Sequence, residues 1–138
     1  MKEYDELIKQ AKQAMEKAYV PYSHFKVGAA VLTKSGKIYT GCNIENASFG
    51  VTNCAERTAI FKAVSEGERE LIRIAIVSSG EDSTYPCGIC RQVMSEFMTK
   101  EAEIILENAN GEIEVFQLQK MFPYSFTQKE YDQLGGKR

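Results

Sequence analysis

The sequence has no tryptophan, a single histidine, three prolines and no long apolar run. Because His24 is the only histidine, the chain cannot form a zinc finger that combines two cysteines with two histidines. The longest apolar stretches, at 27–32 and 74–77, are far shorter than the roughly 20 residues of a membrane-spanning helix. The N-terminus is charged and lacks the apolar segment of a secretory signal. We therefore expect a cytosolic protein that does not bind a membrane.

An excess of basic residues is also missing, because 17 Lys and Arg stand against 19 Asp and Glu, for a net charge of −2. Proteins that bind polynucleotides usually present a basic face to the phosphates, so we expect a small-molecule partner and no nucleic acid. The 138 residues, of which 43% are hydrophobic, suffice for one core and are too few for two ordinary domains. No repeat or linker stands out, and a single domain over residues 1–138 is expected.

Hydrophobic periodicity predicts alternating helices and strands. Apolar residues recur every three to four positions over 4–18, the pattern of an amphipathic helix. Two more helices are expected to begin near Cys54 and Cys87, and strands are expected over 27–33, 38–44, 72–77, 103–106 and 113–118. Two of these strands each follow a helix, which requires crossover connections. The expected fold class is therefore α/β, in three layers, with a mixed five-stranded sheet and helices on both faces.

The four cysteines carry most of the chemical information in the sequence. Cys87 and Cys90 stand three positions apart at the expected start of a helix, a spacing that suits one metal ion. On its own this motif also fits a thioredoxin-like redox pair or half of a structural zinc site. Cys54 begins another expected helix, and helix N-termini favour the deprotonated thiolate that binds metal. These three thiols are together candidates for one zinc site.

The number of ligands decides which kind of zinc site this is. Structural sites are closed by four protein ligands, whereas catalytic sites use three and leave room for water. Cys42, the fourth thiol, lies in an expected strand, where it is expected to pack as a small hydrophobe. An open three-cysteine site is therefore favoured, and a closed site completed by Cys42 is the alternative. A redox role is weaker, because no tryptophan accompanies Cys87.

Two residues close to Cys54 could take part in chemistry at such a site. Glu56 would lie near enough to a metal-bound water to exchange protons with it, although a glutamate here also complements the helix dipole. Arg57 would donate to one or two sulfurs and offset the excess negative charge of three thiolates on one zinc ion. The alternative for Arg57 is an ordinary surface cation.

These residues lie in segments that resemble a known family. The two zinc motifs of the cytidine deaminases are similar to TNCAERTA at 52–59 and PCGICRQV at 86–93. The likeness extends to YSHFKVGAA at 22–30 and GCNIENAS at 41–48, and covers most of the chain from about Pro21 to Phe126. A cysteine as the first ligand resembles the small, homotetrameric members. The sequence is thus identified as a member of the cytidine deaminases.

The resemblance implies a cofactor and a reaction. Cys54, Cys87 and Cys90 would bind one Zn²⁺ per subunit, and Glu56 would be the proton shuttle. The implied enzyme hydrolyses cytidine and 2′-deoxycytidine to uridine and 2′-deoxyuridine plus ammonia, in pyrimidine salvage. A hydroxide on the zinc would attack C4 of the base, and Glu56 would pass protons to ring N3 and to the departing amine.

The resemblance also implies a nucleoside pocket. Asn43 and Glu45 would hold the ribose 3′-hydroxyl, and the carboxylate of Glu45 would repel the phosphate of a nucleotide. The backbone N–H of Ala55 would reach the 2-oxo group of the base, and Phe25 would line the pocket. Phe126 would stack on the base in a neighbouring subunit, so that a homotetramer would complete its active sites.

Two positions depart from the family pattern. Phe49 stands where a tyrosine is common, and Ile89 replaces the usual alanine between the paired cysteines. Neither changes a ligand or the glutamate, so we expect them to affect affinity rather than chemistry. A blasticidin-type or other aminoheterocycle deaminase would share both zinc motifs. The segment 43–48 favours cytidine, because it resembles the nucleoside-binding loop.

Overall fold

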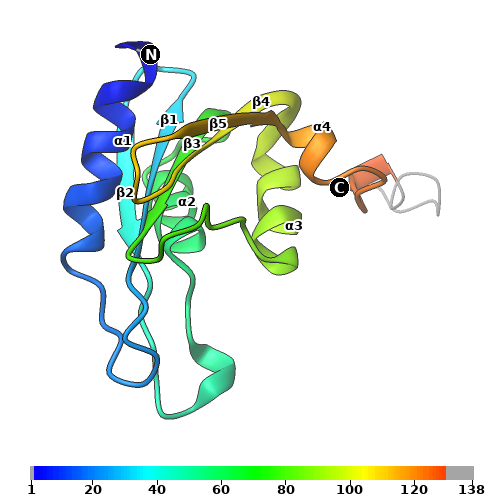
Figure 1. Cartoon of the computed structure of the whole chain (residues 1–138). Helices are drawn as coiled ribbons and strands as arrows, with labels where there is room; N and C mark the ends of the chain where they lie inside the picture. Colours follow the sequence, from blue (N-terminus) through cyan, green and yellow to red (C-terminus); the bar gives the residue numbers. More distant parts are fainter. Residues whose placement is uncertain (1, 130–138) are drawn as a thin grey trace.

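The structure of the protein, a computed structural model, describes residues 2–129 (Figure 1). Helices and strands alternate along the chain in the order α1 (Lys2–Met15), β1 (Val27–Thr33), β2 (Ile38–Cys42), the 3-10 turn η1 (Phe49–Val51), α2 (Ala55–Ser65), β3 (Leu71–Ser78), α3 (Gly88–Phe97), β4 (Met98–Glu107), β5 (Ile113–Gln117) and α4 (Leu118–Met121). All five expected strands are present, so the sequence prediction of the elements is confirmed in outline.

The five strands form one mixed sheet in the order β2-β1-β3-β4-β5. Strands β3 and β4 are parallel, and every other neighbouring pair is antiparallel. The parallel pair is joined by the crossover through α3. Strand β2 is at one edge, beside β1, and the central strands β1 and β3 are buried on both faces.

Helices cover both faces of the sheet, as expected for three layers (Figure 1). On one face, α1 presents an apolar stripe of Tyr4, Leu7, Ile8 and Ala11 to the sheet. On the other face, α2 and α3 pack over a larger core that includes Ile60 and other buried side chains. Alternate residues of β1 and β3 point into one cluster or the other, as strand geometry requires. The α/β/α architecture is therefore confirmed.

Two glycines allow the helices to approach the sheet closely. A Cβ at Gly28 would lie 2.1 Å from the carbonyl oxygen of Ala11 in α1. A Cβ at Gly41, in the edge strand β2, would lie 2.5 Å from the backbone nitrogen of Ala59 in α2. Gly41 therefore sets how close α2, and with it Cys54, lies to the sheet.

The first helix is shorter than its periodicity predicts. It ends at Met15, and the backbone then forms a turn in which Ala18 N–H bonds to Met15 C=O. Tyr19 pairs with the chain just past β2, its N–H bonding to Asn43 C=O at 3.0 Å. This long-range pairing replaces the last helical turn that the apolar spacing favoured.

Strand β4 also differs from its prediction. It begins at Met98, directly after α3, rather than at position 103. Met98 pairs with Leu71 of β3, and the register shifts before Arg73 pairs with Glu103. The exposed polar residues at 99–101 hid this part of the strand, because a half-exposed strand end has no apolar alternation. Among residues 2–129, no helix has the length and apolar character needed to cross a membrane.

Candidate metal centre and active site

The starts of α2 and α3 bring three thiols together. Cys54 is the N-cap of α2 and Cys87 is the N-cap of α3, both with extended backbone. Cys90 lies one turn into α3 and is buried, whereas Cys87 is exposed. The three sulfurs lie within 4.8 Å of one another, and the sulfurs of Cys54 and Cys87 are 3.8 Å apart. The two helix N-termini therefore place three candidate ligands around one point.

The spacing of the sulfurs fits a tetrahedral zinc ion. Zinc–sulfur bonds of about 2.3 Å at the tetrahedral angle place two sulfurs about 3.8 Å apart. Within residues 2–129, no other group of three or more cysteine, histidine or acidic side chains converges in this way. Cys42, in β2, lies outside the group. His24, in the loop before β1, also lies outside it. The donor set is three thiols, which leaves a fourth position for water or substrate.

Electrostatic contacts prepare one of the three thiols, Cys54, to bind a cation. A hydrogen bond from Cys90 and the nearby Arg57 guanidinium together lower the pKa of Cys54 to about 5, although burial acts in the opposite direction. The same contact with Cys54, together with burial, raises the pKa of Cys90. Arg57 Nη2 donates to the Cys54 sulfur at 3.4 Å. Cys54 is thus a thiolate at neutral pH, the form that binds metal.

Glu56 is a buried carboxyl beside this cluster. It lies in the first turn of α2 and is only 4% exposed. Burial, together with the negative charge of Cys54, raises its pKa to about 7. A group with this pKa holds and releases a proton readily at neutral pH, as a general acid and base must.

The segment that follows β2 reaches the metal centre through a short pairing. Ile44 exchanges two backbone hydrogen bonds of 2.9 Å with Asn53, the residue before Cys54. Glu45 N–H bonds to Tyr19 C=O on the other side. This pairing places Asn43 and Glu45 next to the start of α2, although at least nine positions separate them from Cys54 in the sequence.

Asn43 and Glu45 also hold the loop that carries Phe25. Asn43 accepts from Val27 N–H at 2.9 Å and donates to Phe25 C=O at 2.8 Å. Glu45 accepts from the backbone N–H groups of Tyr22 and Ser23 and from the Ser23 hydroxyl. The Ser23 hydroxyl is the main cause of a lowered pKa at Glu45. This supporting role was not predictable from the sequence, because side-chain contacts with a distant loop leave no local signal.

The structure places the other expected residues as follows. Phe25 is partly exposed, and its ring packs against Gly80, where a Cβ would lie 2.9 Å from the ring. Ala55 is the first residue of α2, so its N–H has no acceptor within the helix. Phe126 lies after α4, is 53% exposed, and its carbonyl accepts from Gln92 of α3. The contacts of Phe25 with Gly80 and of Phe126 with Gln92 were not predicted from the sequence.

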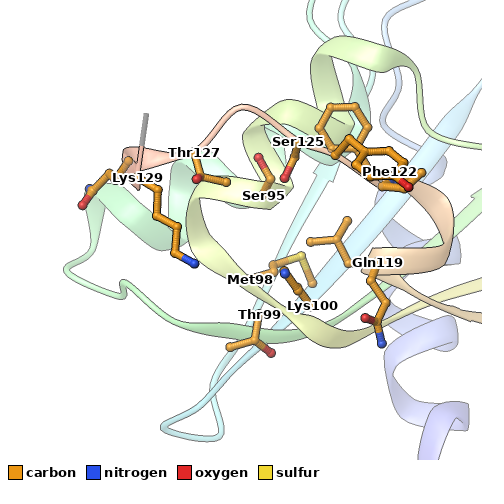
Figure 2. Close-up of a pocket in the computed structure, with 13 residues that line it drawn as sticks. Ser95, Met98, Thr99, Lys100, Gln119, Phe122, Ser125, Thr127 and Lys129 are labelled. Carbon is orange, nitrogen blue, oxygen red and sulfur yellow. The ribbon is translucent and has the colours of Figure 1, made fainter. Parts of the chain in front are cut away.

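Two cavities of about 620 and 600 Å³ are present in the described residues, and the lining of neither includes the three clustered cysteines. The first lies between the end of α3, the start of β4 and the segment after α4, with Ser95, Met98 and Phe122 around it (Figure 2). The second lies between α1, β2 and α2 and is lined in part by Cys42. The exposure of Cys87 leaves the thiol cluster open to solvent.

Comparison with known proteins identifies the family. A family model for the cytidine and deoxycytidylate deaminase zinc-binding region matches residues 1–106. The chain belongs to this family. The matched region contains the cluster of Cys54, Cys87 and Cys90, and the zinc cofactor expected from the sequence is confirmed.

Relatives within the family are similar over nearly their whole length. The chain is 51% identical to the cytidine deaminase of Halalkalibacterium halodurans, over 90% of this chain and 94% of that protein. The crystal structure of cytidine deaminase from Burkholderia pseudomallei has a TM-score of 0.85 at 47% identity, covering 89% of this chain and 98% of that one. A blasticidin-S deaminase of Bacillus cereus is 32% identical over 88% of this chain and 91% of that protein. The expected family and fold are therefore confirmed.

Proposed function

We propose that this protein is a zinc-dependent cytidine deaminase that hydrolyses cytidine and 2′-deoxycytidine to the corresponding uridines and ammonia. The observation that carries the proposal is the open cluster of three thiols with the buried carboxyl of Glu56 beside it. A closed structural site would need a fourth protein ligand, and Cys42 is not part of the cluster. The 51% identity to a cytidine deaminase supports the choice of substrate.

Each group at the metal centre has a proposed role. Cys54, Cys87 and Cys90 hold the zinc ion, and Arg57 offsets the excess charge of their sulfurs. Bound zinc supplies Lewis acidity, which lowers the pKa of a water towards neutrality. Glu56 accepts a proton from the attacking water and delivers it to ring N3 of the base. It then moves the proton of the hydroxyl added at C4 to the exocyclic amine, the C4–N bond breaks, and ammonia leaves.

The nucleoside is proposed to lie between α2 and the segment after β2. The Ala55 N–H at the start of α2 donates to the 2-oxo group of the base. Asn43 and Glu45 bind the ribose 3′-hydroxyl, and Phe25 closes one side of the pocket. The carboxylate of Glu45, held ionised by its hydrogen bonds to Ser23, repels a 5′-phosphate and favours nucleosides over nucleotides.

The proposed assembly is a homotetramer in the cytosol. Phe126 is half exposed on a segment beyond α4, as a ring offered to a neighbouring subunit would be. We propose that it stacks on the base in that subunit's site. The cytosolic location rests on the four free cysteines, which a reducing compartment would preserve.

The alternative is a deaminase of another aminoheterocycle, such as a blasticidin-type compound. The 32% identity to a blasticidin-S deaminase makes this a real competitor. The segment 43–48 favours cytidine, because it resembles the nucleoside-binding loop of the cytidine deaminases and lies beside the start of α2. Since both enzymes would share the metal centre, only the substrate distinguishes them.

The testing experiment follows the ultraviolet absorbance of cytidine with zinc-loaded protein and measures released ammonia. We expect cytidine and 2′-deoxycytidine to be consumed, and Glu56→Ala to lower the rate by about a hundredfold to ten-thousandfold while keeping zinc, because only the proton shuttle is removed. Glu66→Ala, an exposed glutamate at the end of the same helix, is the matched control and should keep full activity. Activity on blasticidin S alone would establish the alternative, and full activity in Glu56→Ala would refute the role of Glu56.

A further inference from the structure

Two adjacent side chains of α3 hold the segment 121–126 at both ends. Arg91, the residue after Cys90, donates from Nη1 to the carbonyl of Met121 at 2.7 Å. Met121 is the last residue of α4. Gln92 donates from Nε2 to the carbonyl of Phe126 at 2.8 Å. The first turns of α3 thus fix where this segment begins and where it ends.

The same arginine binds the loop that carries a metal ligand. Arg91 Nε donates to the carbonyl of Pro86 at 2.7 Å, and its backbone N–H bonds to Cys87 C=O at 3.0 Å. Pro86 is fully buried and immediately precedes Cys87. A planar guanidinium can donate to two carbonyls in fixed directions at once, which an ammonium cannot. Arg91 therefore ties the end of α4 to the metal-ligand loop.

Between its two anchors, the segment runs from Phe122, which packs against the core, to Tyr124 and Ser125. Tyr124 has a positive φ of 56°, a conformation that costs free energy in a residue other than glycine, and its side chain is fully exposed. Phe122 and Ser125 face the cavity that Ser95 of α3 also lines (Figure 2). A strained and exposed segment keeps one conformation only where other contacts impose it. The hydrogen bonds from Arg91 and Gln92 are such contacts.

We propose that Arg91 and Gln92 are positioning residues, which fix the segment 121–126 on α3 and thereby orient the ring of Phe126 towards the nucleoside. Neither residue touches the substrate. The proposal rests on the proposed function, because Phe126 is useful here only if it contacts a nucleoside. The helix that carries Cys90 therefore also sets the orientation of Phe126.

The absence of tryptophan makes the segment directly observable. Phe126→Trp introduces a single indole, and its fluorescence anisotropy in the zinc-loaded protein reports the mobility of the segment. Two further substitutions are then added separately. Gln92→Glu keeps the size of the side chain but replaces the donor with an acceptor. Arg91→Lys keeps the charge but cannot span the carbonyls of Pro86 and Met121.

Matched controls come from α1, on the opposite face of the sheet from α3, and from the loop between α2 and β3. Arg69 also donates from one guanidinium to two backbone carbonyls, those of Val64 and Glu68, so Arg69→Lys imitates the loss at Arg91. Gln10 in α1 donates to Glu6, so Gln10→Glu imitates the loss at Gln92. Both controls should leave the anisotropy and the kinetic constants unchanged.

We expect Gln92→Glu and Arg91→Lys to lower the anisotropy of the indole. In chains that keep Phe126, the KM for cytidine should rise about fivefold, the effect of one lost hydrogen bond of ordinary strength, with a smaller change in kcat. The Gln92→Glu variant should keep one zinc ion per chain. If Arg91→Lys fails to fold, the anisotropy and KM of Gln92→Glu decide the question. Unchanged anisotropy, or an unchanged KM despite lowered anisotropy, would overturn the proposal. If the unsubstituted protein has no deaminase activity, the proposed function is refuted. The anisotropy still tests the anchoring of the segment in that case, because it does not depend on turnover.

Discussion

At the residue scale, the reactivity of the metal centre depends on its net charge. Three thiolates on one Zn²⁺ carry a net negative charge, which opposes removal of a proton from a bound water. The guanidinium of Arg57, 3.4 Å from the Cys54 sulfur, offsets part of that charge. The two sulfurs of Cys54 and Cys90 in turn raise the pKa of Arg57, although its burial acts in the opposite direction. Arg57 is therefore expected to tune the reactivity of the site more than its affinity for metal.

This reasoning predicts the effect of Arg57→Ala. The rate of cytidine deamination should fall by about tenfold or more, as is usual when a group that hydrogen-bonds a metal ligand is lost, while zinc content changes little. Rate and zinc content should be measured on the same preparation. Arg69→Ala, which removes an exposed arginine in the loop between α2 and β3, is the control. Loss of zinc with an unchanged rate per bound zinc would contradict this assignment.

A second prediction separates an open site from a closed one. Cys42→Ser should keep one zinc ion per chain and most of the activity, because Cys42 lies in β2 outside the cluster. Cys54→Ser should lose the metal, because it removes one of three ligands. Zinc bound after exhaustive dialysis is the measurement. Release of zinc from the Cys42 variant would mean that the site is a closed cage, and the enzyme interpretation would then fail.

At the scale of elements, the position of α2 depends on a glycine in the edge strand. A Cβ at Gly41 would lie 2.5 Å from Ala59 N and 2.7 Å from the carbonyl oxygen of Ala55, both of them backbone atoms. Backbone cannot move aside as the end of a flexible side chain can, so α2 itself must shift. Because Cys54 and Glu56 lie at the start of this helix, a substitution that shifts α2 should change both the stability of the protein and the geometry of the metal centre.

Gly41→Ala should therefore destabilise the protein by about 2 kcal/mol, in the range of overpacked cores, and should also lower zinc content. Urea denaturation gives the first quantity and metal analysis the second. Gly50→Ala is the matched control, because a Cβ there meets nothing within 4 Å and its φ is not positive. Equal stability of the two variants would show that α2 does not depend on the close approach at Gly41.

At the scale of the whole molecule, the thiol cluster is open to solvent and Phe126 is half exposed. Both are accessible to a neighbouring subunit in the proposed assembly. If each active site borrows Phe126 from a neighbour, then two inactive variants should complement one another. Phe126→Ala chains keep Glu56, and Glu56→Ala chains keep Phe126. Together they can form sites that contain both residues, although neither chain supplies both.

Mixing equal amounts of the two variants under conditions of subunit exchange should restore about a quarter of the wild-type activity, because half of the chains keep Glu56 and half of their neighbours supply Phe126. Light scattering on the same samples should give the mass of four chains. Activity that does not exceed the average of the separate variants would place Phe126 in the site of its own chain, or in no site.

The sequence by itself determined the fold class, the family and the residues of the metal centre. Those features rest on local patterns: short continuous apolar runs for β1 and β3, a helical stripe for α1, and cysteines at the starts of α2 and α3. A reactive side chain must be of one chemical type and must stand at a fixed place in its element. Type and spacing can both be read directly from the chain.

Only the tertiary structure decided how those residues are supported. It places Glu45 against the Ser23 hydroxyl, begins β4 at Met98, and joins Arg91 to Pro86 and Met121. The contacts join groups from different segments of the chain, and the start of β4 differs from what local propensity predicts. Their free energy depends on packing and hydrogen bonds that exist only after the chain has folded, and no local pattern records them.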